Sequence, residues 1–210
     1  MQLYIISMKK LAVVLLLSLC FACQTDKEAP EGFVNFEAPE GNQPKVTNYY
    51  FIRHAEKDLT TEDDPQLTLE GLERASYWGE YFKDKALDQF YTTKYMRNFQ
   101  TVIPIIHHYK KSPETFSVEE DSLFTKEFWK KTYGQNTVVV GHNNTTPGFC
   151  NEILRNEKYP VINEKTYGNL YHIEIDEKGK IKDTLLSFEN FELPEAIRKS
   201  IRVDVEDATE

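Results

Sequence analysis

The sequence predicts an α/β fold, a three-layer α/β/α sandwich built around a mostly parallel sheet. Short β-rich runs alternate with segments of helical periodicity along the chain, which is the pattern of βα units. Residues 137–140 (Thr-Val-Val-Val) show no polar alternation. This strand should therefore be buried on both faces, as strands of parallel sheets are. Two β-rich runs near the C-terminus flank a hairpin signal at residues 176–180 and should extend the sheet at one edge.

The expected elements follow one another as strands and helices. The first strand covers residues 46–52 and ends at Arg53-His54. A helix then begins after Thr68, whose hydroxyl is suited to cap its N-terminus. A later helix contains Pro104, which should bend it or interrupt its hydrogen bonds locally. The further elements are expected at residues 87–91 (strand), 96–109 (helix), 116–119 (short strand), 122–131 (helix), 137–140 (strand), from 146 (helix), 170–175 and 181–188 (strands) and 192–201 (helix), with a frayed end from 203.

Residues 1–22 are expected to be a signal peptide of the lipoprotein type. Lys9 and Lys10 precede a short apolar run at residues 11–19, which is too short to span a membrane. The run ends near Cys23, and this arrangement resembles a bacterial lipoprotein cleavage site with Cys23 as the lipidated residue. We therefore expect an exported domain in the bacterial cell envelope, bound to the membrane through an N-terminal lipid anchor. An uncleaved anchor and an ordinary signal peptide are the alternatives, and Met8 is an alternative start.

The rest of the chain divides into three parts. Residues 23–44 are expected to be a flexible tether, because acids, prolines and glycines occur there without sustained periodicity. Residues 45–190 should form the folded domain, and residues 191–210 a C-terminal helix and tail. Cys150 is the cysteine that remains in this domain, so no internal disulfide is expected there. Its apolar neighbours predict a buried structural thiol.

The composition excludes binding to polyanions by overall charge. The formal net charge is −9, and the chain without residues 1–22, which hold two lysines and no acids, carries −11. An acidic domain is a poor candidate for nucleic-acid binding. Metal binding is not expected either, because the adjacent His107 and His108 point to different faces of a helix and no carboxylate or thiolate cluster supports them.

Cationic and imidazole side chains follow the three central strands. Arg53-His54 ends the first strand, Gly141-His142 ends the strand at 137–140, and the strand at 87–91 leads to a helix that begins near Arg97. Ligands of open α/β sheets bind beyond the carboxyl ends of the strands, so these residues should converge on one small cationic pocket. Arginines can bind the oxygens of a phosphoryl group there, and an imidazole can attack its phosphorus.

Three ordered motifs resemble those of the histidine phosphatase superfamily, also called phosphoglycerate mutase-like. They are Arg-His-Ala-Glu-Lys at residues 53–57, the segment at 91–101 with its arginine, and Gly-His-Asn-Asn-Thr-Thr-Pro at 141–147. The likeness covers roughly residues 47–175 and is closest to a small bacterial type of this family, here as an exported lipoprotein. The order and spacing of three motifs are far more specific than any one of them.

The resemblance implies a phosphoglycerate mutase-like fold and a phosphatase that needs no metal or cofactor. His54 would be the nucleophile that forms a phosphohistidine intermediate, and Arg53, Arg97 and His142 would bind the phosphoryl oxygens. The substrate would be a small phosphate monoester. Lys57 would contact the rest of this substrate or else be solvated, and Asn144 would line the pocket.

The resemblance does not identify the general acid. Asn143 follows His142, where many members have an acidic residue, so the position of the donor is open. The candidates by position are Asp63, Asp64, Glu119, Glu120 and Asp121. A non-catalytic lipoprotein that binds phosphate or another anion is the main alternative function, and a phosphoglycerate mutase is a further one.

Overall fold

The computed structural model describes residues 34–61, 63–119 and 123–207. The predicted signal peptide, the lipidation of Cys23 and the first part of the predicted tether lie outside these residues and stay predictions. The described residues form one compact unit that begins at Val34. None of their helices is long and apolar enough to cross a membrane.

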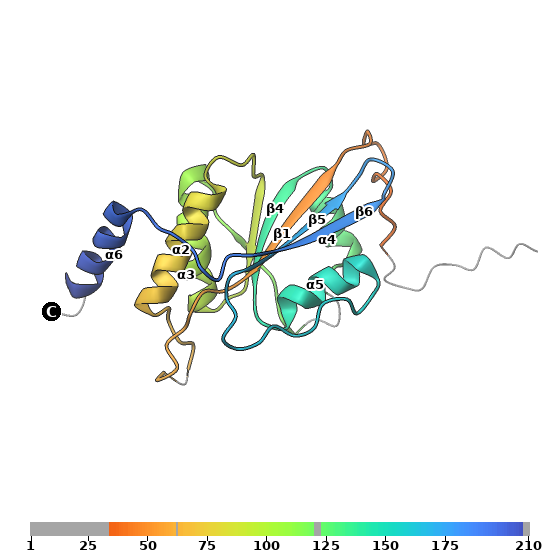
Figure 1. Ribbon diagram of the computed structural model, residues 1–210. Coiled ribbons are helices and arrows are strands. Elements are labelled where there is room, and N and C mark those ends of the chain that lie inside the picture. Colours follow the sequence, from red (N-terminus) through yellow and green to blue (C-terminus); the bar gives the residue numbers. More distant parts are fainter. Residues whose placement is uncertain (1–33, 62, 120–122, 208–210) are drawn as a thin grey trace, which may run out of the picture. The chain divides into compact units, whose positions relative to one another are not determined.

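The centre of this unit is a six-stranded sheet with the strand order β3-β2-β4-β1-β5-β6 (Figure 1). Its four strands β3, β2, β4 and β1 run parallel to one another, and β5 and β6 continue the sheet as an antiparallel hairpin. This arrangement confirms the predicted α/β fold and the hairpin at one edge. The strands are β1 (Thr47–Arg53), β2 (Gln89–Thr92), β3 (Glu114–Thr115), β4 (Asn136–Gly141), β5 (Asn169–Ile175) and β6 (Ile181–Ser187).

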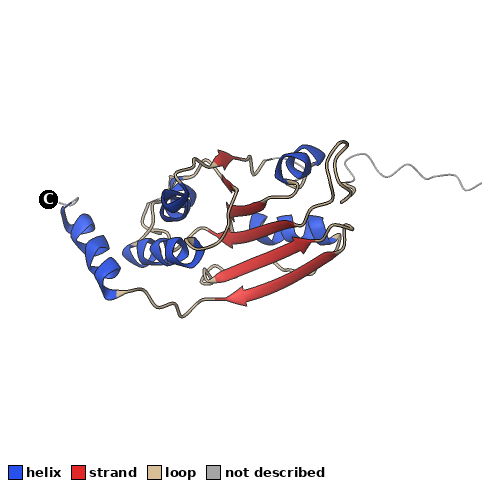
Figure 2. Cartoon of the chain, turned by 90° about the horizontal axis from the view of Figure 1, so that it is seen from above, coloured by secondary structure: helices blue, strands red, loops and turns tan. Residues whose placement is uncertain are grey.

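Helices cover both faces of the sheet, as Figure 2 shows from above. They are α2 (Leu69–Phe82) and α3 (Met96–Tyr109) on one face and α4 (Lys126–Thr132) and α5 (Thr145–Leu154) on the other. A further helix, α6 (Glu195–Asp207), packs against α2. The α2 helix begins after Thr68, whose hydroxyl accepts a hydrogen bond from Gly71 N, as its sequence predicts. The α3 helix keeps its predicted bounds, although Pro104 lies inside it.

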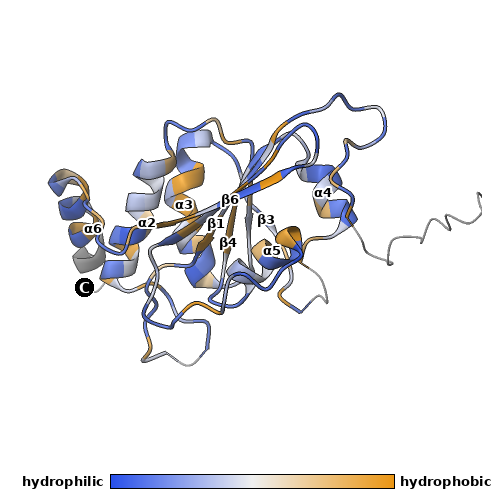
Figure 3. Ribbon diagram, turned by 45° about the vertical axis from the view of Figure 1, so that its right-hand side comes forward, coloured by the Kyte–Doolittle hydropathy of each residue, from blue (hydrophilic) through white to orange (hydrophobic). Residues whose placement is uncertain are grey.

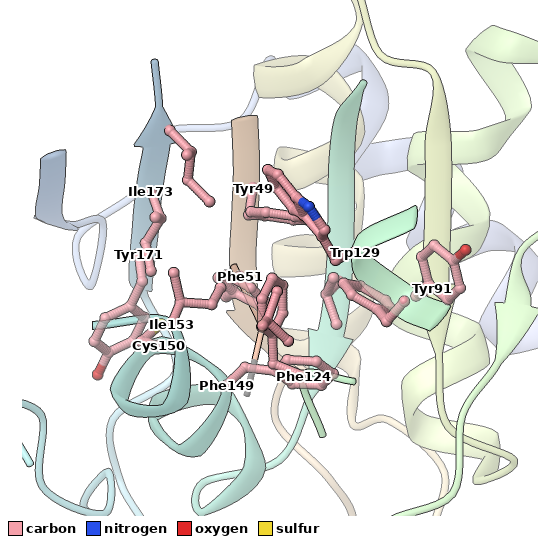
Figure 4. Packing of buried hydrophobic residues seen from close by; sticks show 14 of the residues in the cluster. Tyr49, Phe51, Tyr91, Phe124, Trp129, Phe149, Cys150, Ile153, Tyr171 and Ile173 are labelled. Carbon is pink, nitrogen blue, oxygen red and sulfur yellow. The ribbon is translucent and has the colours of Figure 1, made fainter. Parts of the chain in front are cut away.

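The two faces of the sheet form two separate hydrophobic clusters because alternate side chains of a strand point to opposite faces. Tyr49 and Phe51 of β1 pack with α4 and α5, as Figure 4 shows, whereas Ile52 packs with α2 and α3. Strand β4 is buried on both faces, as its run of valines predicts. In Figure 3 the central strands are correspondingly hydrophobic, and much of α6 is hydrophilic.

The predicted tether is wrong in its second half. Val34 and Phe36 are buried in the cluster of α4 and α5, and the ring of Phe36 lies 5.5 Å from that of Trp129. The indole N–H of Trp129 also donates to Glu37 O, and Arg155 donates to Val34 O. The folded domain therefore begins about ten residues before the predicted boundary, because the side chains of Val34 and Phe36 pack against the core.

Three further predicted boundaries are corrected. The short strand expected at 116–119 is formed by Glu114–Thr115, which pairs with the end of β2. The helix expected at 122–131 is α4 at Lys126–Thr132, capped by the Thr125 hydroxyl. The C-terminal helix continues to Asp207, so the expected fraying at 203 is wrong; Arg198 and Arg202 both pair with Glu73 of α2 and hold it there.

Candidate active site

The three parallel central strands end at the same edge of the sheet. Arg53, the last residue of β1, is the register partner of Gly141, the last residue of β4. Thr92 at the end of β2 is the partner of Val140. The next residues along β1 and β4 are His54 and His142, so the two histidines lie side by side, with ring centroids 5.4 Å apart. The predicted convergence at the strand ends is therefore present.

Helix α3 is joined to this edge through two polar side chains. The Thr101 hydroxyl accepts a hydrogen bond from Ala55 N (2.9 Å) and donates to Arg97 O (2.7 Å). The Asn98 amide donates to Val140 O and Gly141 O, at 3.1 and 3.0 Å. Both residues are fully buried. Arg97 is therefore fixed relative to both histidine-bearing strands, and the sequence contained no signal for either contact.

Helix α5 closes against the end of β4 at Gly141. The Thr145 hydroxyl accepts from His142 N (2.9 Å), and the Thr146 hydroxyl donates to Ile52 O (3.2 Å). A Cβ atom on Gly141 would lie 2.8 Å from both hydroxyl oxygens. This close approach places the N-terminus of α5 beside His142. Free N–H groups at such a helix start favour a bound anion.

His54 is buried and has a fixed tautomer. Its Nδ1 lies 2.8 Å from Ala55 O. Because a carbonyl oxygen can only accept, Nδ1 carries the proton and Nε2 keeps its lone pair. Burial, together with the nearby positive charge of Arg53, lowers the pKa of His54 to about 2, although the bond to Ala55 O acts in the opposite direction. The imidazole is therefore neutral and nucleophilic near pH 7.

His142 is held between Thr93 and Arg97. Its Nε2 lies 3.1 Å from Thr93 Oγ1, and its Nδ1 lies 3.4 Å from Arg97 Nη2. A guanidinium group cannot accept, so Nδ1 is the acceptor and Nε2–H donates to the threonine. Burial and the charge of Arg97 lower the pKa of His142 to about 4. The ring of Tyr95 packs edge-on against His142 and lies 4.5 Å from Arg97 Cζ.

Arg53 is 1% exposed, and most of its hydrogen bonds go to one loop. Its Nη1 donates to the carbonyl oxygens of Asn163, Glu164 and Thr166 at 3.0 to 3.2 Å. Its Nη2 donates to Glu164 Oε2 at 3.0 Å, and its Nε has no partner among the described residues. The ring of Tyr167 stacks on the guanidinium, 4.2 Å from Cζ.

Arg97 is mostly buried near the start of α3, with a side chain 13% exposed. Besides His142, its guanidinium contacts Asp64 at 3.5 Å. Asp64 also accepts from Met96 N at 2.9 Å and so caps α3. Its contact with Arg97 is long, so the cation is only weakly neutralised and can bind an anion.

These side chains surround one small cavity of about 240 Å³. All six residues predicted for the site line it: Arg53, His54, Lys57, Arg97, His142 and Asn144. Its remaining wall comes from Tyr95, Val118, Asn143 and Glu164. Glu164 was not predicted, because it lies in a polar loop without periodicity or motif. Its side chain reaches the site only through tertiary packing.

The predicted acid candidates do not converge on this cavity. Asp63 and Asp64 are exposed, and Asp64 is bound to the start of α3. Glu119 lines a second cavity of about 340 Å³, which shares Tyr95 and Val118 with the first. Glu120 and Asp121 lie outside the described residues. In the part of the chain that is described, no group of three His, Cys, Asp or Glu side chains could bind a metal ion.

The sequence of the first half of the domain matches a known family. Residues 49–120, which include β1, Arg53, His54 and Arg97, match the model of the histidine phosphatase superfamily (branch 1). Over these residues the domain is similar to the histidine phosphatase superfamily. No curated protein matches the chain in sequence.

Solved structures share the fold of this domain at low identity. A variant of the phosphoserine phosphatase from Entamoeba histolytica, in complex with phosphoserine, has a TM-score of 0.51 and 14% identity, covering 69% of this chain and 97% of that one. The phosphoglycerate mutase from Bacillus anthracis has a TM-score of 0.50 and 14% identity, with 70% and 94% covered. The protein histidine phosphatase SixA complexed with tungstate has a TM-score of 0.50 and 15% identity, with 67% and 96% covered. These likenesses confirm the predicted phosphoglycerate mutase-like fold.

The two site histidines should make the domain less stable in acid. Their pKa values in the folded protein, about 2 and about 4, lie below the ordinary value of 6.5. Above pH 6.5 both histidines are neutral in the folded and in the unfolded protein. Below it the unfolded chain binds protons that the folded chain does not, so stability falls as the pH falls from 6.5 toward those values.

We expect each histidine to lower the free energy of unfolding by on the order of 1 to 2 kcal/mol between pH 7 and pH 5. Urea unfolding at both pH values checks this in the wild type, His54→Asn and His142→Asn. Each variant should lose less stability on acidification than the wild type. Equal losses in all three proteins would contradict the prediction.

Proposed function

We propose that this domain hydrolyses a phosphate monoester through a phosphohistidine intermediate on His54. One observation carries the proposal. The Nδ1–H of His54 is bound to Ala55 O, which leaves Nε2 as a neutral nucleophile, and His54 lines a small cavity together with two arginines. A buried imidazole with this tautomer and these cations is suited to attack phosphorus.

The reaction would proceed in two displacements. His54 Nε2 attacks the phosphorus, the bond to the leaving-group oxygen breaks, and that oxygen takes up a proton. Water then attacks the phosphohistidine, and inorganic phosphate leaves. Arg53 and Arg97 would stabilise the negative charge on the phosphoryl oxygens, and charge stabilisation of this kind is the main catalytic contribution in phosphoryl transfer. His142 would contribute a hydrogen bond once its Nε2–H turns from Thr93 to a phosphoryl oxygen.

The rest of the substrate would occupy the second cavity. It meets the first cavity, which holds His54 and the two arginines and is called the phosphoryl pocket from here on, at Tyr95 and Val118. The other walls of the second cavity include Lys94, Phe116 and Glu119. Its volume of about 340 Å³ is near the lower end of ligand pockets, which suits a small organic alcohol. Among the described residues that line this cavity, Glu119 is the one carboxylate, so it remains the candidate donor of a proton to the leaving oxygen.

The comparisons support a phosphatase of this family and leave its substrate open. The likeness to the phosphoserine phosphatase and to the tungstate-bound SixA is one of fold, at 14% and 15% identity. The alternative is a lipoprotein that binds an anion without turnover. The lack of an evident proton donor in the phosphoryl pocket favours this alternative. Among the described residues that line the pocket, the one carboxylate is Glu164, and it is paired with Arg53.

Hydrolysis of p-nitrophenyl phosphate by the full chain, purified in detergent, tests the proposal. This substrate has a good leaving group, so little acid catalysis is needed. We expect turnover that resists EDTA and that inorganic phosphate inhibits competitively. A folded protein without turnover from about pH 4 to 8, the range around imidazole and carboxylate pKa values, would overturn the phosphatase in favour of the binding protein. Turnover of phosphoglycerate that depends on 2,3-bisphosphoglycerate would instead show a mutase.

A further inference from the structure

Glu164 bridges two residues of the phosphoryl pocket. Its Oε2 accepts from Arg53 Nη2 at 3.0 Å, and its Oε1 accepts from Asn143 Nδ2 at 2.6 Å. The Glu164 side chain is 68% exposed, whereas that of Arg53 is 2% exposed. The carboxylate therefore lies at the solvent side of the pocket, and water can solvate it if it moves away from the arginine.

The hydrogen bonds of Arg53 leave one edge of its guanidinium for an anion. Nη1 is used by the three carbonyl oxygens of residues 163–166. The remaining edge consists of Nε, which has no partner among the described residues, and Nη2, which donates to Glu164. A phosphoryl group bound in the two-pronged manner that arginine favours needs both nitrogens of such an edge.

We infer that Glu164 is an internal competitor of the phosphoryl group for Arg53. In the free protein its carboxylate takes Nη2 of the edge that the substrate needs. On binding, one phosphoryl oxygen replaces Oε2 at Nη2, a second approaches Nε, and Glu164 turns out to solvent. This inference rests on the proposed function, because it assumes that the cavity binds phosphoryl groups.

The competition sets the affinity of the pocket. We call the protein open when Glu164 has left Arg53 and closed when the two are paired. A ligand that binds only the open state has an observed dissociation constant equal to its intrinsic dissociation constant divided by the fraction of protein that is open. Ion pairs with one exposed partner are weak, so Glu164 should hold the closed state by only a modest margin. Removing its charge should therefore strengthen phosphate binding by roughly threefold to tenfold.

Titration calorimetry with inorganic phosphate tests this on the full chain in detergent. We compare the wild type with Glu164→Gln, which keeps the size of the side chain, and Glu164→Ala, which removes it. Glu177→Gln serves as the matched control, because this exposed carboxylate lies in the turn between β5 and β6 and does not line the pocket. We expect a lower dissociation constant in both Glu164 variants and no change in the control.

Each outcome decides the inference. Unchanged or weaker phosphate binding in both Glu164 variants would overturn it; weaker binding would show instead that Glu164 positions Arg53. Absence of phosphate binding in all four proteins would overturn it as well. The proposed function is tested separately. Turnover without any gain in phosphate affinity would leave the phosphatase and reject the competitor, whereas a gain in affinity without turnover would do the reverse.

Discussion

His54→Ala is expected to lower the hydrolysis of p-nitrophenyl phosphate by about a thousandfold or more, because it removes the atom that forms the covalent intermediate. The substitution leaves the arginines in place, so phosphate should still bind. Initial rates at saturating substrate measure the effect. Quenching the reaction with detergent at alkaline pH should also trap phosphate on the wild type, which acid then releases, and none on the variant.

A histidine elsewhere on the chain provides the control for this experiment. His107→Ala carries the same substitution at an exposed position in the last turn of α3 and should keep wild-type rates. Urea unfolding of both variants verifies that they fold. A folded His54→Ala protein with a rate within tenfold of the wild type would rule out His54 as the nucleophile, whatever the wild-type activity.

Gly71→Ala should cause a large loss of stability through the addition of a single methyl group. Gly71 lies in the first turn of α2, directly against the chain that follows His54. A Cβ atom there would lie 2.1 Å from Glu56 O and 3.0 Å from Glu56 C. The obstacle is backbone, which already accepts a hydrogen bond from Thr68 N, so no side chain can turn away.

We expect Gly71→Ala to lower the free energy of unfolding by about 3 kcal/mol or more, in the upper range for overpacking. It should also reduce activity, because α2 and residue 56 have to separate. Urea denaturation measures the first effect, and p-nitrophenyl phosphate turnover of the fraction that remains folded measures the second.

Gly148→Ala is the matched control for this prediction. Gly148 lies inside α5, and a Cβ atom there meets only Leu123 Cδ1 at an ordinary 3.5 Å. Alanine is the better helix former by about 1 kcal/mol, so this variant should be as stable as the wild type or more so. If both variants lost the same stability, the contact between Gly71 and Glu56 could not be the cause.

The sequence predicted those parts of the fold and site that depend on local pattern. The valines of β4 predicted a strand buried on both faces, and the histidines directly after β1 and β4 predicted where the two would meet. These predictions succeed because neighbouring residues in the sequence determine where a strand ends and which of its faces is buried. Arg97 followed from the same logic at the start of α3.

The parts that were missed depend on contacts between distant residues. Val34 and Phe36 lie in a short apolar run between segments rich in acids, prolines and glycines, so only the packed core shows that they are buried. β3 is two exposed residues paired to β2, which no hydrophobic pattern could predict. Glu164 reaches Arg53 across more than a hundred residues. Periodicity cannot predict a contact of this kind, because it describes only one element at a time.

The position of β1 within the sheet has a consequence for how the site would fail under stress. Strand β1 is hydrogen-bonded on one side to β4 and on the other to β5, so neither of its edges is free. Amide groups in such an interior strand exchange with solvent mainly through opening of the whole domain rather than through local fraying. His54, the proposed nucleophile that follows it, is thus attached to one of the last elements to open. Heat or denaturant would therefore abolish the proposed activity as the domain unfolds, and not in an earlier, separate step.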